Sequence, residues 1–441
     1  MSHNIFGTDG VRGRANEGLI TPDSAMRLAV AVTSYYQRKC HSKEADYKFT
    51  VVIGKDTRLS GYMLEPALTS GFIAAGANVI LLGPIPTPGV AYMTKSLRAN
   101  LGVVISASHN PYHDNGIKFF NADGFKVTME DEDGISNAYW QPLTLTKTEF
   151  MGKAWRLDDA AGRYVEFTKG SFPKELNLSG MKIVVDTANG AAYKVAPQVL
   201  WEFGADIIKI GNTPDGLNIN DGYGVMDTSR LQEEVLKHKA CIGIAFDGDA
   251  DRVAIVDETG ELIDGDYLIS TIATSWLNSG RLRGNAVVAT IMTNLAMERY
   301  LDSIGINLVR TDVGDKHVMQ KMIEIGANVG GEQSGHIITG DYSTTGDGIV
   351  SALQILAYLK SMGVQASTIK KLYTPCPSII KNIPLDLSCS LDKYREAGER
   401  IVGHAGRIIV RKSGTEQFVR VLIEATSTDL VNAAATAVCN L

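Results

Sequence analysis

The sequence has little cysteine, and it lacks the patterns that cysteine-rich sites require. Five cysteines occur among the 441 residues, an odd number, and no two of them form a Cys-x-x-Cys pair. They are widely spaced, at Cys40, Cys241, Cys376, Cys389 and Cys439. Neither a disulfide framework nor a zinc site is therefore expected.

Long hydrophobic runs and an export signal are also missing. No apolar run approaches the ~18 residues that a membrane span requires. The first residues, Met1 to Asp9, contain neither a basic segment nor an apolar segment, so no secretory signal is recognised there. We therefore expect a cytoplasmic protein with no membrane partner.

Excess positive charge and two common catalytic signatures are absent as well. The 43 Lys and Arg residues are outnumbered by 49 Asp and Glu residues, for a net charge of −6. A chain without a basic excess is not expected to bind nucleic acid over a large surface. The sequence also lacks the Gly-x-x-x-x-Gly-Lys loop of nucleotide-binding proteins and the Gly-x-Ser-x-Gly elbow of α/β-hydrolases.

A strand–helix–strand pattern occurs three times along the chain. In each repeat an aliphatic run is followed by a polar loop, a helix, a glycine and a second aliphatic run, over residues 50–81, 182–208 and 286–309. Such runs are typical of strands buried on both faces, and the spacing predicts parallel crossovers. The glycine is expected to end each helix in a left-handed conformation. We therefore expect three similar α/β domains.

Weakly patterned segments suggest where the domains end. One begins at Glu130–Gly134 and lasts to about Trp155, after which a helix is expected to start at Asp158 or Asp159. The other, residues 374–384, contains three prolines. The expected domains are residues 1–155, 156–255, 256–370 and 371–441.

The tail of the chain has a different character. Apolar and polar residues alternate over residues 407–411 and 418–423, which predicts two strands, and a helix is expected from about Asp429. The fourth domain is therefore expected to be smaller and of the α+β class.

The strongest candidate for a metal site is a run of three aspartates that follows an apolar segment. Asp247, Asp249 and Asp251 occupy alternate positions and can point the same way in an extended loop. Carboxylate oxygens suit Mg²⁺. An EF-hand is an alternative, because Glu258 falls at the twelfth position, but Arg252 stands where that loop needs glycine.

A second candidate site carries nucleophile and proton-transfer chemistry. Ser108 and His109 follow an apolar run, with Lys118 nearby in sequence. A hydroxyl beside an imidazole and an amine can serve nucleophilic catalysis. A Ser-x-x-Pro segment is also typical of an ordinary helix start, so the pattern alone leaves both interpretations open.

Two further loops have the donors and acceptors that a sugar phosphate needs. Glu332, Ser334 and His336 lie in a glycine-rich segment, where mixed donors and acceptors suit sugar hydroxyls, although a polar turn explains the segment equally well. A second loop suits a phosphate group because arginine, hydroxyls and glycine backbone form an anion cradle. Its residues are Arg411, Ser413, Gly414 and Thr415, with Arg420 one short strand onward.

The combination of motifs resembles the α-D-phosphohexomutase superfamily over the whole chain. The segments that carry the resemblance occur in the order Phe6–Gly13, Ser106–Pro111, Asp247–Arg252, Glu332–His336 and Arg411–Glu416. The opening segment, Val313–Asp315 and Gln333 are most similar to the branch that acts on glucosamine phosphates. The resemblance implies three similar mixed-sheet α/β domains and a smaller C-terminal α+β domain around a central cleft.

The resemblance also implies a role for each motif. Ser108 would carry a phosphoryl group and, with Asp247, Asp249 and Asp251, hold Mg²⁺. Arg12, His109 and Lys118 would flank the reacting group. In the substrate site, Glu332, Ser334 and His336 would hold sugar hydroxyls, and Arg252 would help to balance the negative charge. The phosphate that does not react would be bound by Arg411, Ser413, Gly414, Thr415 and Arg420.

The implied reaction exchanges glucosamine 6-phosphate and glucosamine 1-phosphate through a 1,6-bisphosphate, upstream of UDP-N-acetylglucosamine. A hexosamine or hexose 1,6-bisphosphate would act as primer, and the protein would be a monomer or a homodimer. Alternatives are a relative specific for glucose or mannose phosphates, a Mg²⁺-dependent sugar phosphatase, or a sensor without catalysis.

Four residues depart from the superfamily pattern. Lys412 and Gln417 stand where prolines are usual, and Lys316-His317 stands where an Arg-Tyr pair is usual. Because arginine and lysine differ in how they bind anions, the resemblance gives the least support to contacts that involve these loops.

Overall fold

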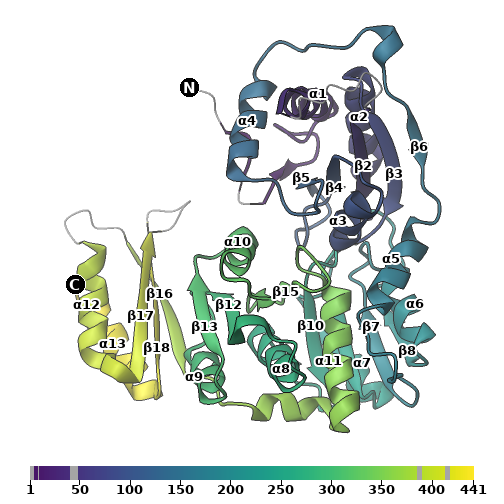
Figure 1. The fold of residues 1–441 in the computed structure, drawn as a ribbon. Helices are drawn as coiled ribbons and strands as arrows, with labels where there is room; N and C mark the ends of the chain where they lie inside the picture. The colour runs from purple at the N-terminus through teal and green to yellow at the C-terminus, as the bar shows by residue number, and fades with distance from the viewer. Residues whose placement is uncertain (1–3, 8, 40–47, 385–389, 413–417) are drawn as a thin grey trace.

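A computed structural model describes the protein over residues 4–7, 9–39, 48–384, 390–412 and 418–441. Its sheets follow one another along the chain. Figure 1 shows the first domain above the second and third, with the fourth domain beside the third. The expected fold class, three mixed-sheet α/β domains followed by a smaller α+β domain, is confirmed.

The first domain is built on a six-stranded sheet in the order β1-β5-β4-β2-β3-β6. Its strands are β1 (Val11–Arg14), β2 (Thr50–Lys55), β3 (Asn78–Pro84), β4 (Leu101–Ile105), β5 (Asp114–Asn121) and β6 (Ala154–Arg156). Its helices are α1 (Pro22–Lys39), α2 (Gly61–Ala74), α3 (Thr87–Ser96) and α4 (Met129–Tyr139), with the 3₁₀ turn η1 (Thr148–Phe150). The sheet is mixed because β5 runs antiparallel to both of its neighbours.

The second and third domains repeat this plan with smaller sheets, ordered β11-β10-β9-β7-β8 and β13-β12-β14-β15. The second contains α5 (Ala160–Lys169), β7 (Lys182–Asp186), α6 (Val195–Glu202), β8 (Asp206–Ile210), α7 (Ser229–His238), β9 (Ile242–Phe246), β10 (Val253–Asp257) and β11 (Leu262–Ile263). The third contains α8 (Gly265–Asn278), η2 (Arg283–Asn285), β12 (Ala286–Thr290), α9 (Leu295–Ser303), β13 (Asn307–Thr311), α10 (Asp315–Ile325), β14 (Val329–Gly331), β15 (Ile337–Thr339), α11 (Gly348–Met362) and η3 (Ala366–Lys371).

The three predicted crossovers are confirmed. Each joins two parallel neighbours, β2 to β3, β7 to β8 and β12 to β13. The glycines that follow the crossover helices have positive φ angles, 93° at Gly76, 89° at Gly204 and 79° at Gly305. A residue with a Cβ is strained in this conformation, so glycine lets the chain turn sharply back into the sheet.

The fourth domain packs two helices on a three-stranded antiparallel sheet in the order β16-β18-β17. Its elements are β16 (Ser378–Pro384), α12 (Leu391–Val402), η4 (Gly403–Ala405), β17 (Gly406–Lys412), β18 (Phe418–Ala425) and α13 (Thr428–Cys439). The two strands and the last helix are as predicted. The segment expected to be only a boundary also forms β16, an edge strand, where proline is tolerated because one side needs no N–H donors.

The segment at Glu130–Gly134 also differs from the expectation of weak patterning, because it forms α4. Thr128 caps this helix by accepting a hydrogen bond from the Asp131 backbone N–H, and the Asp131 side chain accepts one from the Thr128 N–H. This reciprocal capping box was visible in the sequence as a Thr-x-x-Asp spacing. The three predicted domain boundaries stay predictions; β10 continues the second sheet across residue 255.

One of the hydrophobic clusters extends through the first three domains, beside a separate cluster in the first domain around Leu28, Val51 and Phe72. A single cluster of buried side chains includes Val52 of the first domain, Val185 of the second and Leu353 of the third. The fourth domain has a separate core around Tyr394, Val421 and Val438. The first three domains are therefore packed as one unit, and the fourth is packed on its own.

The contact between α1 and α2 gives a first test of the fold. A Cβ at Gly71 would lie 2.4 Å from the Met26 carbonyl oxygen and 2.8 Å from the Ala29 Cβ. We expect Gly71→Ala to lower the thermal midpoint, because overpacking costs about 1–3 kcal/mol. Gly162→Ala in α5 is the control: nothing lies within 4 Å of its added Cβ, and alanine stabilises an open helix position by about 0.5–1 kcal/mol. Equal midpoints would contradict the packing.

The N-terminus of α11 gives a second test. Asp347 accepts hydrogen bonds from Val350 N at 3.0 Å and from the Tyr164 hydroxyl at 2.9 Å. Burial raises the pKa of Asp347 to about 6, above the ~3.9 of an exposed aspartate. The folded protein therefore holds a proton that the unfolded chain has released between these values, so stability falls as pH rises from about 4 through about 6.

The variant Asp347→Asn keeps both hydrogen bonds, because an amide oxygen accepts from Val350 and the Tyr164 hydroxyl accepts from an amide N–H. We expect its thermal midpoint to rise relative to the wild type between about pH 4 and about pH 7. A difference that stays constant over this range would show that the Asp347 carboxyl does not titrate there.

Candidate active site

The three aspartates predicted to hold a metal come together in the loop after β9. Asp247, Asp249 and Asp251 are all buried, and one oxygen of each lies within 4.8 Å of those of the others. The loop reverses at Ala250, where φ is 57°, before β10 pairs antiparallel with β9. Because the loop joins two paired strands rather than two helices, the EF-hand alternative is excluded.

The charges in this loop fit a divalent cation. Asp249 Oδ1 and Asp251 Oδ1 have no hydrogen-bond partner among the described residues. Burial, reinforced by Asp251 and Asp249, raises the pKa of Asp247 well above its ordinary value. Unpartnered carboxylate oxygens crowded in a dry site are the ligands that Mg²⁺ takes. The residues present therefore fit a bound Mg²⁺.

Ser108 is held against this loop by the turn that follows β4. Its side chain is buried, and its Oγ donates a hydrogen bond to Asp247 Oδ2 at 2.6 Å. His109 Nδ1 lies 3.5 Å from Ser108 Oγ. Burial, followed by the charges of Arg252 and Arg12, lowers the pKa of His109 to about 4, so its imidazole is neutral at neutral pH.

Lys118 on β5 connects the first domain to the aspartate loop. Its Nζ lies 2.9 Å from Asp249 Oδ2, 3.0 Å from Asp9 Oδ2 and 3.5 Å from Asp251 Oδ2. Burial alone lowers the pKa of Lys118, but the three carboxylates outweigh burial and raise it above its ordinary value. Arg12 on β1 is paired with Asp9 and so reaches the same cluster.

The predicted sugar-binding loop lies between β14 and β15, on the surface of β10. A Cβ at Gly335 would lie 2.1 Å from the Val253 carbonyl oxygen, so only glycine lets the loop approach this closely. Ser334 is exposed, and Glu332 is half-buried and accepts a hydrogen bond from Gly314 N at 3.2 Å. Arg252 lies beside the triad, with Nε 4.0 Å from Asp251 Oδ1.

His336 is turned into the protein rather than towards the surface. Its Nε2 accepts a hydrogen bond from Gly346 N at 3.1 Å, and its Nδ1 lies 3.6 Å from Asp251 Oδ1. Burial lowers the pKa of His336, but the charges of Asp251 and Asp315 outweigh it and raise the pKa. His336 therefore ties the sugar loop to the aspartates.

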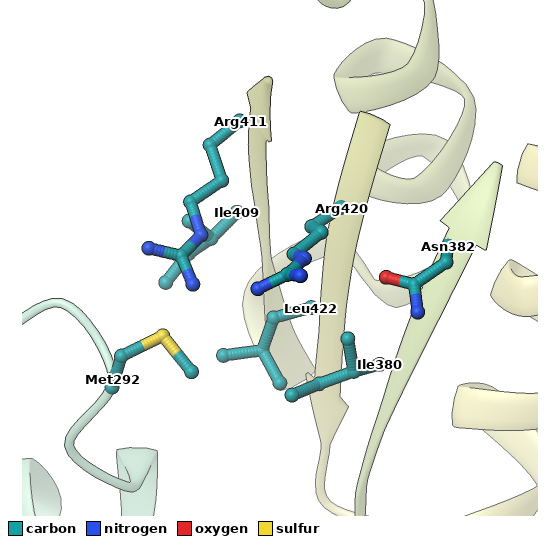
Figure 2. Close-up of a pocket in the computed structure, with 7 residues that line it drawn as sticks. All are labelled: Met292, Ile380, Asn382, Ile409, Arg411, Arg420 and Leu422. Atoms are coloured by element: carbon teal, nitrogen blue, oxygen red, sulfur yellow. The ribbon is translucent and has the colours of Figure 1, made fainter. Parts of the chain in front are cut away.

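The two arginines of the predicted phosphate cradle lie in the fourth domain. Arg411 on β17 is directly opposite Arg420 on β18. They line a cavity of about 190 Å³, and Figure 2 shows both guanidinium groups beside it, with Met292 of the third domain across from them. Its other lining residues are Ile380, Asn382, Ile409 and Leu422. Ser413, Gly414 and Thr415 lie outside the described residues.

The structure adds charged residues that the sequence did not single out. Lys126 Nζ lies 2.5 Å from Asp9 Oδ1 and pairs with Asp315 at the start of α10. Lys316, one of the departures from the superfamily pattern, pairs with Glu132. These pairs join the first domain to the third. The sequence indicated a possible role for Asp9, because it stands three residues before Arg12 in a glycine-rich loop. No pattern around Lys126 indicated a role for that residue.

Comparison with known proteins agrees with this architecture. The family models for phosphoglucomutase/phosphomannomutase alpha/beta/alpha domains I, II and III match residues 3–144, 162–260 and 264–376, and that for the C-terminal domain matches residues 366–441. A phosphoglucomutase/phosphomannomutase family protein from Burkholderia thailandensis has the same fold, with a TM-score of 0.82 at 24% identity over 98% of this chain and 96% of that one.

Relatives of higher identity have a more specific name. Phosphoglucosamine mutase from Paramagnetospirillum magneticum is 50% identical over 99% of this chain and 98% of its own length. Phosphoglucosamine mutase from Zymomonas mobilis is 50% identical over 100% of this chain and 98% of its own. Among the described residues, no helix is both long and apolar enough to cross a membrane.

The chain thus belongs to the phosphoglucomutase/phosphomannomutase family, whose members are phosphohexomutases. Within that family it belongs with the phosphoglucosamine mutases. It is an enzyme of the intramolecular phosphotransferase class.

The aspartate loop gives a third test. We expect Asp249→Asn to weaken Mg²⁺ binding by about tenfold or more, because fewer charged ligands lower affinity. Titration calorimetry measures this directly. Asp257→Asn on β10 is a matched control: Asp257 is equally buried, and its Oδ1 accepts all three of its hydrogen bonds, which an amide oxygen also accepts. Equal affinity in both variants would place the metal elsewhere.

Proposed function

We propose that the protein interconverts glucosamine 6-phosphate and glucosamine 1-phosphate, with Ser108 as the carrier of the phosphoryl group. The observation that carries this proposal is the buried Ser108 Oγ, 2.6 Å from Asp247 within the aspartate loop. The substrate follows from relatives named phosphoglucosamine mutase at 50% identity.

The proposed exchange has two steps. Phospho-Ser108 transfers its phosphoryl group to the C1 hydroxyl oxygen, so the Oγ–P bond breaks, an O1–P bond forms and the hydroxyl proton leaves. The resulting glucosamine 1,6-bisphosphate turns end over end in the site. The O6–P bond then breaks as an Oγ–P bond forms at Ser108, the serine hydroxyl proton passes to O6, and glucosamine 1-phosphate is released.

Charge placement supports this assignment, because phosphoryl transfer depends on positioning and on stabilising negative charge. When bound by Asp247, Asp249, Asp251 and an oxygen on Ser108, Mg²⁺ supplies positive charge beside the phosphoryl group. Lys118 supplies a second, fixed charge: its ammonium lies within 3.5 Å of three carboxylates. It serves as a charge rather than as a base, since an ammonium has no lone pair to offer.

The proton of the sugar hydroxyl is assigned to His109. Its Nδ1 lies 3.5 Å from Ser108 Oγ, at the point where oxygens exchange the phosphoryl group. Proton carriers act within hydrogen-bond reach or through one water, and the neutral imidazole of His109 can accept a proton.

A cradle remote from Ser108 is required by the exchange. Because the intermediate presents either end to the serine, one site must hold whichever phosphate is not reacting. Arg411 and Arg420 face each other across neighbouring strands, and paired guanidinium groups bind phosphate well. We assign the sugar hydroxyls to Glu332 and Ser334, with His336 holding their loop against Asp251, and the reacting phosphate to Arg12 and Arg252.

The remaining predictions concern context. A hexosamine or hexose 1,6-bisphosphate would prime Ser108, and the product would feed UDP-N-acetylglucosamine synthesis in the cytoplasm. A monomer or homodimer is expected.

The reaction is tested by phosphorus NMR. The purified protein is incubated with glucosamine 6-phosphate, Mg²⁺ and a trace of hexose 1,6-bisphosphate. A growing anomeric phosphate signal without inorganic phosphate is the expected result. Inorganic phosphate would identify a phosphatase, and a signal obtained only with glucose or mannose phosphates would identify a hexose-specific relative.

The carrier is tested by Ser108→Gly, which removes the hydroxyl and suits the positive φ of 53° at this position. We expect turnover to fall below about one ten-thousandth, as on loss of a covalent nucleophile, while calorimetry finds glucosamine 6-phosphate binding within a few-fold of the wild type. Substantial turnover by this variant would rule out the phosphoserine scheme.

A further inference from the structure

A buried arginine holds the loop that carries Ser108 through hydrogen bonds to its backbone. Arg58 lies between β2 and α2 and is only 1% exposed. Its Nε donates to Asp56 Oδ2 at 2.7 Å, and its two terminal nitrogens donate to four backbone carbonyls of the serine loop. These carbonyls belong to Ser108 (2.9 Å), Asn110 (2.8 Å), Asp114 (3.1 Å) and Pro111.

A second group reaches the same carbonyls from the second domain. Asn220 Nδ2 lies 2.9 Å from the Ser108 oxygen and 3.0 Å from the Asn110 oxygen. Its own backbone is fixed by a hydrogen bond from its N–H to the Ala188 oxygen at 2.9 Å. Donors from two domains therefore converge on two carbonyl oxygens beside the reacting side chain.

The backbone at Ser108 needs this support. Its φ is 53°, in the left-handed region that residues with a Cβ rarely adopt. Such a strained backbone conformation persists only where several surrounding contacts hold it in place. Here its carbonyl receives both Arg58 and Asn220, and its N–H donates to Ser106 Oγ at 2.9 Å. Ser106 Oγ in turn donates to Asp56 Oδ2, which also binds Arg58.

We propose that Arg58 and Asn220 are positioning residues for phosphoryl exchange at Ser108, an inference that rests on the function proposed above. They act on the serine backbone, so they fix the direction in which Oγ points. Asn220 also fixes the separation of two loops, because it comes from the domain that carries the aspartates. That separation is tight: a Cβ on Gly248 would lie 2.6 Å from the Ser108 oxygen.

The test uses Asn220→Gly. Asn220 has a φ of 59°, so glycine removes its side-chain donor without backbone strain. We expect kcat for glucosamine 6-phosphate to fall about tenfold to a hundredfold, as when a reacting group is displaced slightly. KM should stay within about twofold, because uniform substrate binding is untouched. The rate at which bisphosphate phosphorylates Ser108, followed by intact mass, should fall in parallel with kcat.

Asn285→Gly is the matched control. Asn285 also has a positive φ, 46°, but it is exposed and lies in η2 of the third domain. We expect wild-type kcat and KM from this variant. A kcat for Asn220→Gly within threefold of the wild type, or a KM that rises as much as kcat falls, would overturn the positioning role.

A variant that adds a negative charge at Asn220 distinguishes a positioning role from a role in folding. Asn220→Asp keeps the size of the side chain and its tolerance of positive φ, but it turns a carboxylate towards two carbonyl oxygens. We expect it to be slower than Asn220→Gly at a comparable thermal midpoint, and equal or faster turnover would count against the proposal. Wild-type protein that fails to turn over glucosamine 6-phosphate would contradict the proposed function instead, so the two failures are distinct.

Discussion

Three carboxylates buried in one loop need positive charge close by, because a dry environment leaves their repulsion unscreened. The protein supplies part of that charge from elsewhere in the fold. Lys118 comes from the first domain and places its ammonium 2.9 Å from Asp249, while His336 of the third domain approaches Asp251 with an imidazole nitrogen. Side chains of the first and third domains thus approach the loop after β9, and the site is formed where the three domains meet.

The same constraint accounts for the packing of the first three domains. Lys126 and Asp315 connect the first domain to the third, and the hydrophobic core continues through all three. A rigid frame of this kind suits phosphoryl transfer, in which fixed charges must already stand where the transition state needs them. Small displacements between Ser108 and the aspartates would change the reaction rate more than they change binding.

The sequence predicted the parts of the molecule that depend on local pattern. Aliphatic runs and terminal glycines predicted the three crossovers, and alternate aspartates after a strand predicted the loop at Asp247. Roles for individual residues, Ser108 among them, came from resemblance and remain predictions. Arg58 and Asn220 could not be identified, because each acts on backbone carbonyls about 50 to 110 residues away. The capping box at Thr128 has its own Thr-x-x-Asp spacing, but four consecutive acidic residues mask the helical pattern there.

The separate core of the fourth domain has an evolutionary consequence. Because Tyr394, Val421 and their neighbours pack only among themselves, substitutions there do not require compensating changes in the other domains. Arg411 and Arg420, which line the cavity on β17 and β18, can therefore diverge at their own pace, while the loops around Ser108 are constrained by three domains at once. The cavity that these arginines line can therefore change in shape or charge without changes in the loops around Ser108 and the three aspartates.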